Sequence, residues 1–296
     1  MHFQKSHYDE WPKLGLIRPS FYYGEIGENM MNLEQHATNI RKNIVTEVYS
    51  AKSGHPGGSL SAADILTELY FEQMDINEEN VNTIDRDRFV LSKGHASPVL
   101  YTTLKEKGLL EEDLTTFRHI DSKLHGHPNM NYVAGVDMST GSLGQGISCA
   151  VGMALASKMS NDNATIYCII GDGESQEGQI WEASMYASQK KLNNFILFLD
   201  NNGMQIDNYT DQINSLINPA KKWESFGFYA QTINGNDISE IDEAIDNAKK
   251  QKDKPSIIVL NTVKGKGVSF IEKLGVANHS TTISKEQLEE ALEELK

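Results

Sequence analysis

The chain has 296 residues, of which 39 % are hydrophobic, and its formal net charge is −14 at pH 7. This length and apolar content are sufficient for one large globular domain with a substantial core. The acidic balance and the absence of any Lys or Arg cluster argue against a nucleic-acid partner or an anionic membrane partner, because such surfaces require a basic patch.

The cysteines and the N-terminal sequence indicate the cellular compartment. The chain has only two cysteines, Cys149 and Cys168, and both lie in apolar runs where buried, reduced thiols are expected. The first thirty residues contain no apolar signal-peptide segment, and nowhere does the chain keep about 18 apolar residues together. We therefore expect a soluble cytoplasmic protein with no membrane segment.

The N-terminal part of the chain divides into an arm and the start of a domain. Residues 1–35 mix aromatic and polar side chains without a sustained period, so we expect an irregular arm that packs on a neighbour. Residues 36–296 are expected to form a single domain. It begins with two amphipathic helices, within 33–53 and 60–71, joined by a chain reversal at the sequence GHPGG.

The rest of the domain alternates apolar strands with helices. Near-continuous apolar strands separated by helices are typical of a parallel sheet covered by helices on both faces. We therefore predict a three-layer α/β/α fold with a mainly parallel sheet. The expected strands are 88–92, 165–170, 194–200, 226–233 and 255–261, and the expected helices begin near Ser97, follow the glycines of GSLGQG (141–146), and cover 177–191, 237–251 and 284–296.

A Gly-Asp-Gly turn, residues 171–173, follows one of these strands and opens a helix. In an open parallel sheet, ligands bind beyond the carboxyl ends of the strands, where helices present free N–H groups. Glycine lets the backbone approach a phosphate closely, but Asp172 would repel a bare anion. The conflict disappears if Asp172 holds a divalent cation that bridges to the phosphates. Taken alone, the motif also fits an ordinary tight turn.

A second polar turn follows the next strand about thirty residues later, where Asp200-Asn201-Asn202-Gly203 ends the run FILFLD. Two adjacent strand ends can aim the Asp172 carboxylate and the Asn202 amide oxygen at one ion. Because Mg²⁺ prefers near-octahedral oxygen ligation, a backbone carbonyl and diphosphate oxygens would complete the shell. The paired turns are far more specific than either turn alone.

This pair of turns resembles the fingerprint of the thiamin diphosphate enzymes, in which GDG is followed about thirty residues later by NN. Other stretches resemble the transketolase family in order and in approximate spacing, so that the resemblance covers residues from about 36 to 280. Whole transketolases are about twice this length, and the likeness ends with their first, diphosphate-binding domain. The stretches are SGHPGGSLSAADIL (53–66), DRFVLSKGHASPVLY (87–101), GHP (126–128), STGSLGQGIS (139–148) and GDGESQEGQIWEA (171–183).

The resemblance implies a ligand set for the metal and the cofactor. Asp172, Asn202 and the carbonyl of Met204 match the metal ligands, for Mg²⁺ with Ca²⁺ or Mn²⁺ as alternatives. The positions that match cofactor contacts are His95 and the Gly173 amide at the diphosphate, Gly141 and Leu143 beside the thiazolium ring, and Glu177 at the subunit contact that leads to the partner's cofactor-activating carboxylate.

The resemblance also assigns roles to histidines, which suit such a pocket because one imidazole can donate a hydrogen bond and move a proton near neutral pH. His55 and His127 match residues that face substrate hydroxyls. His279 falls where the family places a histidine near the diphosphate and the reacting carbons, although it stands in VANHSTT rather than in the more usual HG context. His119 and His125, in a polar loop, are expected to be surface residues.

Structural roles remain the alternative at several neighbouring positions. Glu174 and Asp200 adjoin the two turns, yet each also fits a plain acid at a helix start or a strand end. The glycines of GSLGQG suit either close helix packing or close approach to the thiazolium ring. Both readings stay open for these residues.

The resemblance implies transfer of a two-carbon ketol unit from a ketose phosphate to an aldose phosphate with thiamin diphosphate. In the family, a glutamate from a different domain activates the cofactor, and nothing after residue 280 resembles that domain. We therefore expect a split transketolase, active only with a second subunit that resembles the C-terminal half and supplies most sugar-phosphate contacts. An α2β2 heterotetramer is the expected assembly.

Two other functions are compatible with the metal fingerprint. The α-subunit of a 2-oxoacid dehydrogenase also carries it and also needs a β-subunit, but the segments SGHPG and KGHAS fit transketolase better. A non-catalytic scaffold of the same fold is the second alternative. It would have no use for buried ligand groups, which cost desolvation when they bind nothing.

Overall fold

The structure is a computed structural model that describes residues 32–206 and 208–296. Residues 1–31, which hold most of the predicted arm, lie outside the described residues. Helix α1 (Leu33–Ala51) lies within the predicted helical stretch 33–53, and its first residues overlap the end of the predicted arm. A capping box fixes its start, since the Asn32 side chain accepts from the Gln35 amide and the Gln35 side chain accepts from the Asn32 amide.

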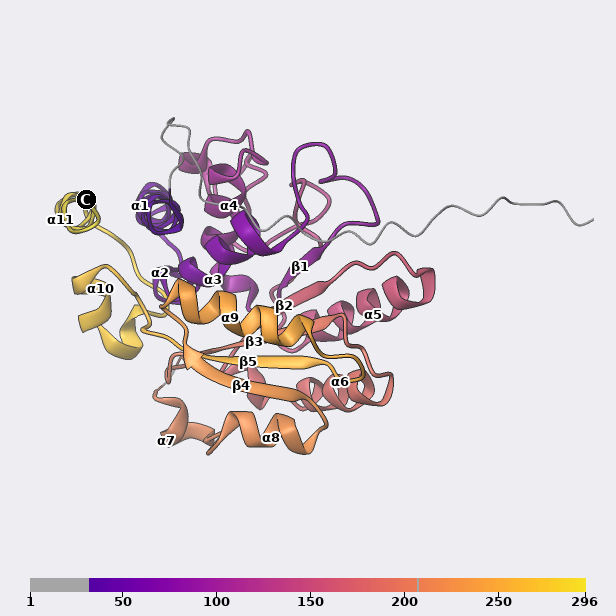
Figure 1. Ribbon diagram of the computed structural model, residues 1–296. Coiled ribbons are helices and arrows are strands. Elements are labelled where there is room, and N and C mark those ends of the chain that lie inside the picture. The colour runs from indigo at the N-terminus through magenta and orange to yellow at the C-terminus, as the bar shows by residue number, and fades with distance from the viewer. Residues whose placement is uncertain (1–31, 207) are drawn as a thin grey trace, which may run out of the picture. The chain divides into compact units, whose positions relative to one another are not determined.

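The centre of the domain is a sheet of five parallel strands in the order β1-β2-β3-β5-β4 (Figure 1). All five predicted strands are present, which confirms the predicted fold class. In the register of β2 and β3, Gly171 lies opposite Asp200, so the two polar turns leave the sheet side by side. The strands are β1 (Arg88–Leu91), β2 (Ile166–Gly171), β3 (Phe195–Asn201), β4 (Tyr229–Asn234) and β5 (Ser256–Asn261).

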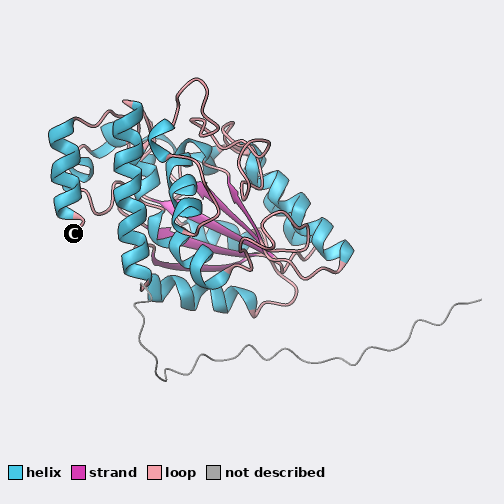
Figure 2. Ribbon diagram, turned by 90° about the horizontal axis from the view of Figure 1, so that it is seen from above, coloured by secondary structure: helices cyan, strands magenta, loops and turns pink. Residues whose placement is uncertain are grey.

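Alternate side chains of the strands enter two separate cores. Phe89, Tyr167 and Phe198 pack on one face of the sheet, whereas Cys168 and Leu197 pack on the other. Helices cover both faces, as the views from the side and from above show (Figures 1 and 2). The first core includes α3 (Ala63–Glu68), α4 (Ser97–Glu106) and α9 (Ile238–Lys249), with α1 and α11 (Lys285–Glu294) packed together beyond them, and the second includes α5 (Gln145–Ser160), α6 (Gly178–Gln189) and α8 (Pro219–Ser225).

Several short elements differ from the sequence-based expectation. The sequence GHPGG (54–58) leads into a short helix, α2 (Pro56–Leu60), rather than forming a simple reversal, because Pro56 at the first helical position fixes a helical φ angle. Helices α7 (Thr210–Asn214), α8 and α10 (Ser269–Lys273) were not expected. Helix α11 begins with a capping box formed by Ser284 and Gln287. Throughout the described ranges, every helix is too short or too polar to cross a membrane.

Candidate active site

The two polar turns meet at the carboxyl ends of β2 and β3. The Asp172 amide donates to the Asp200 carbonyl at 3.2 Å, and the Gly203 amide donates to Asp172 Oδ2 at 2.6 Å. The other oxygen of Asp172 accepts from the Gly173 amide at 2.8 Å. The structure therefore brings the predicted Asp172 and the Asn202 turn into direct contact.

The predicted metal ligands all offer oxygen. Asn202 is held by its own hydrogen bonds, since its Nδ2 donates to Asp200 Oδ2 at 3.1 Å and its Oδ1 accepts from the Met204 amide at 3.1 Å. The Lys264 ammonium lies 3.4 Å from the Met204 carbonyl. Burial and the nearby Asp200 carboxylate raise the pKa of Asp172 to about 7.

These residues fit a divalent cation with a diphosphate. A carboxylate, an amide oxygen and a backbone carbonyl are hard ligands of the type that Mg²⁺ takes, with phosphate oxygens in the remaining positions. Burial is the main cause of the raised pKa of Asp172, and a bound cation would stabilise the charged form of this carboxylate. Within the described part of the chain, no group of three or more His, Cys, Asp or Glu side chains is placed to hold a metal ion.

Asp200 holds the two polar turns in place through its buried side chain. Its side chain is fully buried and accepts from Lys93 Nζ, Thr262 Oγ1 and, at 2.6 Å, Ser61 Oγ. Burial by itself would raise the pKa of Asp200, but the Lys93 ammonium and these hydrogen bonds outweigh it and lower that pKa. Because Asp200 also fixes the Asn202 amide, it is more than the strand-end acid that the sequence allowed.

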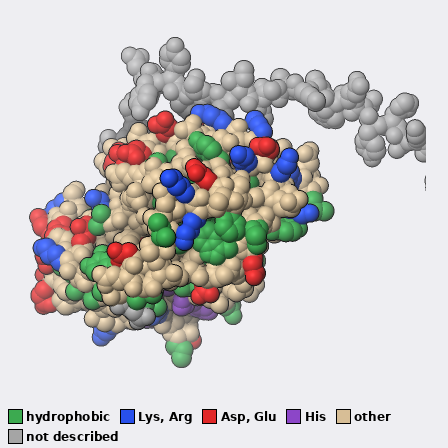
Figure 3. Space-filling view, turned by 90° about the horizontal axis from the view of Figure 1, so that it is seen from below, with side chains coloured by type: hydrophobic (Ala, Val, Ile, Leu, Met, Phe, Trp, Pro, Cys, Tyr) green, Lys and Arg blue, Asp and Glu red, His purple; other side chains and the backbone are tan. Residues whose placement is uncertain are grey.

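Four histidines from distant parts of the chain gather beside the turns. Ring centroids of His55 and His95 are 5.3 Å apart, those of His55 and His279 are 5.2 Å apart, and those of His95 and His279 are 5.0 Å apart. His127 lies further out, 6.5 Å from His55, and is exposed. All four histidines singled out from the sequence are thus neighbours, and Figure 3 shows histidine side chains gathered at one place on the face seen from below.

The surroundings keep these imidazoles neutral. Burial, with a contribution from the Arg118 guanidinium, lowers the pKa of His55 to about 4. Burial and the Lys264 ammonium lower the pKa of His279 to about 4, and burial places the pKa of His95 well below its ordinary value. At neutral pH each ring therefore offers one N–H donor and one nitrogen acceptor.

His279 lacks the glycine that usually follows this histidine in the family, and the packing of the preceding residue fixes its position. The neighbouring Asn278 is fully buried, and its Nδ2 donates to the carbonyls of Lys264 at 3.1 Å and Ile271 at 3.2 Å. A Cβ on Gly57 would lie 2.5 Å from Asn278 Oδ1, so GHPGG packs directly on this segment. His279 Nδ1 lies 3.5 Å from Lys264 Nζ.

The glycines of GSLGQG allow close packing, one of the two roles that the sequence left open, and approach to the thiazolium ring stays a prediction. Gly144 has a φ of 83°, which favours glycine, and a Cβ on Gly146 would lie 2.6 Å from Ser92 Oγ. Gly141, with a φ of 149°, packs on the His127 ring, 3.0 Å from where its Cβ would be. The intervening Leu143 lines the cavity, as it must to lie beside a cofactor ring.

The turns, His95 and His279 enclose a cavity of about 280 Å³. Its lining includes Asp172, Asn202, Met204, Leu143 and, at its exposed edge, Glu177. Most of the predicted site residues therefore face one cavity at the carboxyl ends of the strands.

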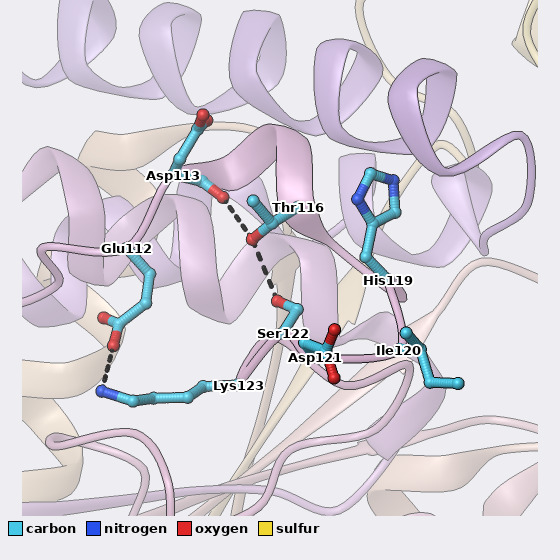
Figure 4. A pocket seen from close by; sticks show the side chains of 8 residues that line it. All are labelled: Glu112, Asp113, Thr116, His119, Ile120, Asp121, Ser122 and Lys123. Carbon is cyan, nitrogen blue, oxygen red and sulfur yellow. Dashed lines mark hydrogen bonds and ion pairs between the residues drawn. The ribbon is translucent and has the colours of Figure 1, made fainter.

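A larger hollow of about 730 Å³ lies over the loop 112–123 (Figure 4). Its polar groups bond to one another, Lys123 to Glu112 at 2.7 Å and Thr116 to Ser122 at 2.9 Å. His119 is exposed there, as expected from the sequence. Since nothing in this loop converges on a common point, we place the functional site in the smaller cavity.

Two lysines of the site were not expected from the sequence. Lys93 and Lys264 are almost fully buried, and both line the cavity. Burial lowers the pKa of Lys264 to about 8. Lys93 follows β1 and Lys264 follows β5, so the strand-end rule that found Asp172 would have found both lysines had it been applied to every strand.

An open parallel sheet with carboxylate, amide and carbonyl oxygens at two adjacent strand ends, and with histidines and lysines around one cavity, defines a diphosphate-binding type of domain. Comparison with known proteins agrees. Residues 33–295 match the family model described as transketolase, thiamine diphosphate binding domain. The chain therefore belongs to the transketolase family.

Similar proteins include both short subunits and full-length transketolases. The chain is 46 % identical to the 6-deoxy-6-sulfo-D-fructose transketolase subunit SqwG of Clostridium sp. (strain MSTE9), with 91 % of this chain and 98 % of that protein covered. It is 39 % identical to an apulose-4-phosphate transketolase subunit of Phocaeicola vulgatus, with 89 % of this chain and 93 % of that protein covered. The crystal structure of Campylobacter jejuni transketolase is similar with a TM-score of 0.82 and 37 % identity, over 90 % of this chain but only 43 % of that one.

Proposed function

We propose that this chain is the diphosphate-binding subunit of a two-subunit transketolase, which transfers a two-carbon ketol unit from a ketose phosphate to an aldose phosphate. The observation that carries the proposal is that the Asp172–Asn202 turns, His95 and His279 line one cavity, with the rings of His55 and His127 beside those histidines. The named subunits of similar length are transketolase subunits, which supports this reading over a 2-oxoacid dehydrogenase subunit.

Asp172, Asn202 and the Met204 carbonyl would hold Mg²⁺, or Ca²⁺ or Mn²⁺ in its place. When bound, thiamin diphosphate supplies the nucleophilic carbon that carries the two-carbon unit between sugars. The Gly173 amide and His95 would bind its diphosphate. Leu143, which lines the cavity, and Gly141, which packs on the His127 ring, would lie beside the thiazolium ring.

The remaining histidines are suited to hydrogen bonding with sugar oxygens. His55 Nδ1 is buried and has no hydrogen-bond partner in the described residues, so the described part of the chain leaves its hydrogen-bonding capacity unused. His127 is exposed at the outer end of the cluster, where it would meet an entering substrate. Because the low pKa values of His55 and His279 keep both rings neutral, each can donate a hydrogen bond at one nitrogen and accept one at the other.

A second subunit would complete the site. The chain matches only 43 % of the Campylobacter transketolase, while it covers nearly all of the short subunits. Glu177 stands exposed at the cavity edge, where a residue that contacts another subunit is expected. We propose an α2β2 assembly in the cytoplasm, with the cofactor between the two kinds of subunit.

Reconstitution tests the proposal. The full chain, a partner that resembles the C-terminal half of transketolase, or both together would be assayed for ketol transfer between sugar phosphates and for decarboxylation of a 2-oxoacid. Ketol transfer is expected only from the mixture. Robust transfer by the isolated chain would contradict the split assembly, and decarboxylation without transfer would contradict the activity.

A further inference from the structure

Glu174 is a buried carboxylate that no step described above uses. It follows the GDG turn directly and is only 3 % exposed. Its Oε1 accepts from Ser92 Oγ at 2.5 Å and from the Gly144 amide at 2.9 Å, and its Oε2 accepts from the Gly171 amide at 3.0 Å. An acid that merely favours a helix start would be exposed and would not need three donors.

The three donors belong to three different segments. Ser92 follows β1, Gly171 ends β2, and Gly144 is the residue from which α5 begins. The Gly144 position lacks a capping side chain of its own. Glu174 therefore supplies, from another part of the chain, the acceptor that holds this turn against the end of the sheet.

The loop that ends at Gly144 has a second attachment. Thr140 Oγ1 donates to the Leu91 carbonyl at 2.7 Å, and a Cβ on Gly94 would lie 2.7 Å from the Gly141 amide. Gly141 and Leu143 lie between the attachment at Thr140 and the attachment at Gly144. Fixing both ends of so short a segment fixes the position of Leu143 at the cavity.

We propose that Glu174 is a positioning residue, which holds the loop carrying Gly141 and Leu143 at the cofactor cavity by accepting from Gly144, Gly171 and Ser92 together. The part that concerns the cofactor rests on the proposed function. The part that concerns the loop does not, because the hydrogen bonds belong to this chain alone.

Only a carboxylate can serve all three donors. In Glu174→Gln, the side-chain amide can take two orientations. If its oxygen takes the Oε1 position, its NH₂ group faces the Gly171 amide, so that two donors face each other. With the amide turned over, the NH₂ group faces the Gly144 amide instead, although Ser92 can rotate and accept. Either orientation leaves one backbone N–H without its acceptor.

Two other variants separate this effect from general destabilisation. Ser92→Ala removes one donor but keeps both amide contacts of Glu174. Asp137→Asn alters a similarly buried carboxylate, which accepts from Arg86, Arg88 and the Phe89 amide at the opposite end of β1. Asp137→Asn should lower stability without reaching the cavity.

Hydrogen exchange by NMR or mass spectrometry on the full chain tests the loop directly. The Gly144 amide should be protected in the wild type, and Glu174→Gln should speed exchange across 141–146 by roughly 10- to 100-fold, since a bond to a charged acceptor is lost. Ser92→Ala and Asp137→Asn should leave this loop within about threefold of the wild type. An unprotected Gly144 amide in the wild type would overturn the proposal even if Glu174→Gln did not fold.

Titration of thiamin diphosphate with Mg²⁺ into the reconstituted complex tests the consequence. Glu174→Gln should weaken cofactor binding by roughly 10-fold or more, while Asp137→Asn should not. If the wild-type complex binds the cofactor and Glu174→Gln binds it equally well, the positioning role is wrong. If the wild-type complex does not bind the cofactor, the proposed function is wrong, and the exchange of 141–146 still decides the loop attachment.

Discussion

The imidazole rings of His55 and His279 lie 5.2 Å apart, edge to face, although one precedes α2 and the other lies close to α11. Their contact depends on the packing of GHPGG against Asn278. Two neutral rings so close, with the Lys264 and Arg118 cations nearby, resist protonation. This gives the site a pH dependence whose sign can be derived.

Stability is expected to fall as the pH is lowered from 7 to 5. The pKa of His55 is about 4 in the folded chain, below its ordinary value of 6.5, so the unfolded chain binds more protons in this range. The stabilisation is complete above pH 6.5 and is lost towards pH 4. His55 alone should account for a loss of about 1–2 kcal/mol in the free energy of unfolding between pH 7 and 5, allowing for its partial exposure.

Urea unfolding of the full chain at both pH values measures this contribution. Compared with the wild type, His55→Asn should lose less stability on acidification, whereas His119→Asn, which changes an exposed histidine, should behave like the wild type. Asp172 has the opposite effect on stability, since its raised pKa of about 7 makes the folded state take up protons as the pH falls. Because the wild type and His55→Asn share Asp172, its effect cancels when their losses of stability are compared. Equal slopes for the wild type and His55→Asn would contradict the assignment.

His127 is expected to act on the substrate and not on the cofactor. It lies at the exposed end of the histidine cluster, 6.5 Å from His55. In the reconstituted complex, His127→Ala should lower kcat/KM for ketol transfer by about 10-fold or more through loss of a hydrogen bond to a sugar hydroxyl, with thiamin diphosphate affinity unchanged. His119→Ala, in the hollow of Figure 4, is the matched control. An equal effect of both substitutions would refute a specific role for His127.

Removal of the Lys93 charge should destabilise the chain strongly. Lys93 and Asp200 form a buried ion pair, and Lys93→Met leaves the Asp200 carboxylate uncompensated. A loss of about 3–5 kcal/mol in the free energy of unfolding is expected, and adding Asp200→Asn should restore much of it. Chemical denaturation measures both. Lys123→Met, which breaks the exposed pair with Glu112, should change stability little, and a comparable loss there would argue against burial as the cause.

The sequence was sufficient to predict the sheet and the two turns, for physical reasons. Apolar runs such as FILFLD mark buried strands, and a parallel sheet places every strand's carboxyl end at one edge. Asp172 and Asn202 could therefore be paired from the order of strands and turns along the chain. The histidines were found only through the family resemblance, because no local pattern connects His55 with His279.

The rest depended on strand order and on long-range contacts. Strand β5 lies between β3 and β4, which places Thr262 against Asp200, and no periodicity in the sequence determines that order. Helices of five residues such as α7 and α10 are too short to show a helical period. The three donors to Glu174 come from separate segments, so its role could not be read from its neighbours in the sequence.

Calorimetric titration of thiamin diphosphate into the reconstituted complex, with and without Mg²⁺, tests the central claim most directly. We expect binding by the wild type only when Mg²⁺ is present. Asp172→Asn, which keeps the shape but removes the charge, should weaken binding at least roughly 100-fold, because even residues outside a metal's ligand shell cost 10- to 100-fold. Asp113→Asn, on the exposed loop of Figure 4, should bind like the wild type. Full cofactor affinity in Asp172→Asn, or in the wild type without a divalent cation, would contradict the account.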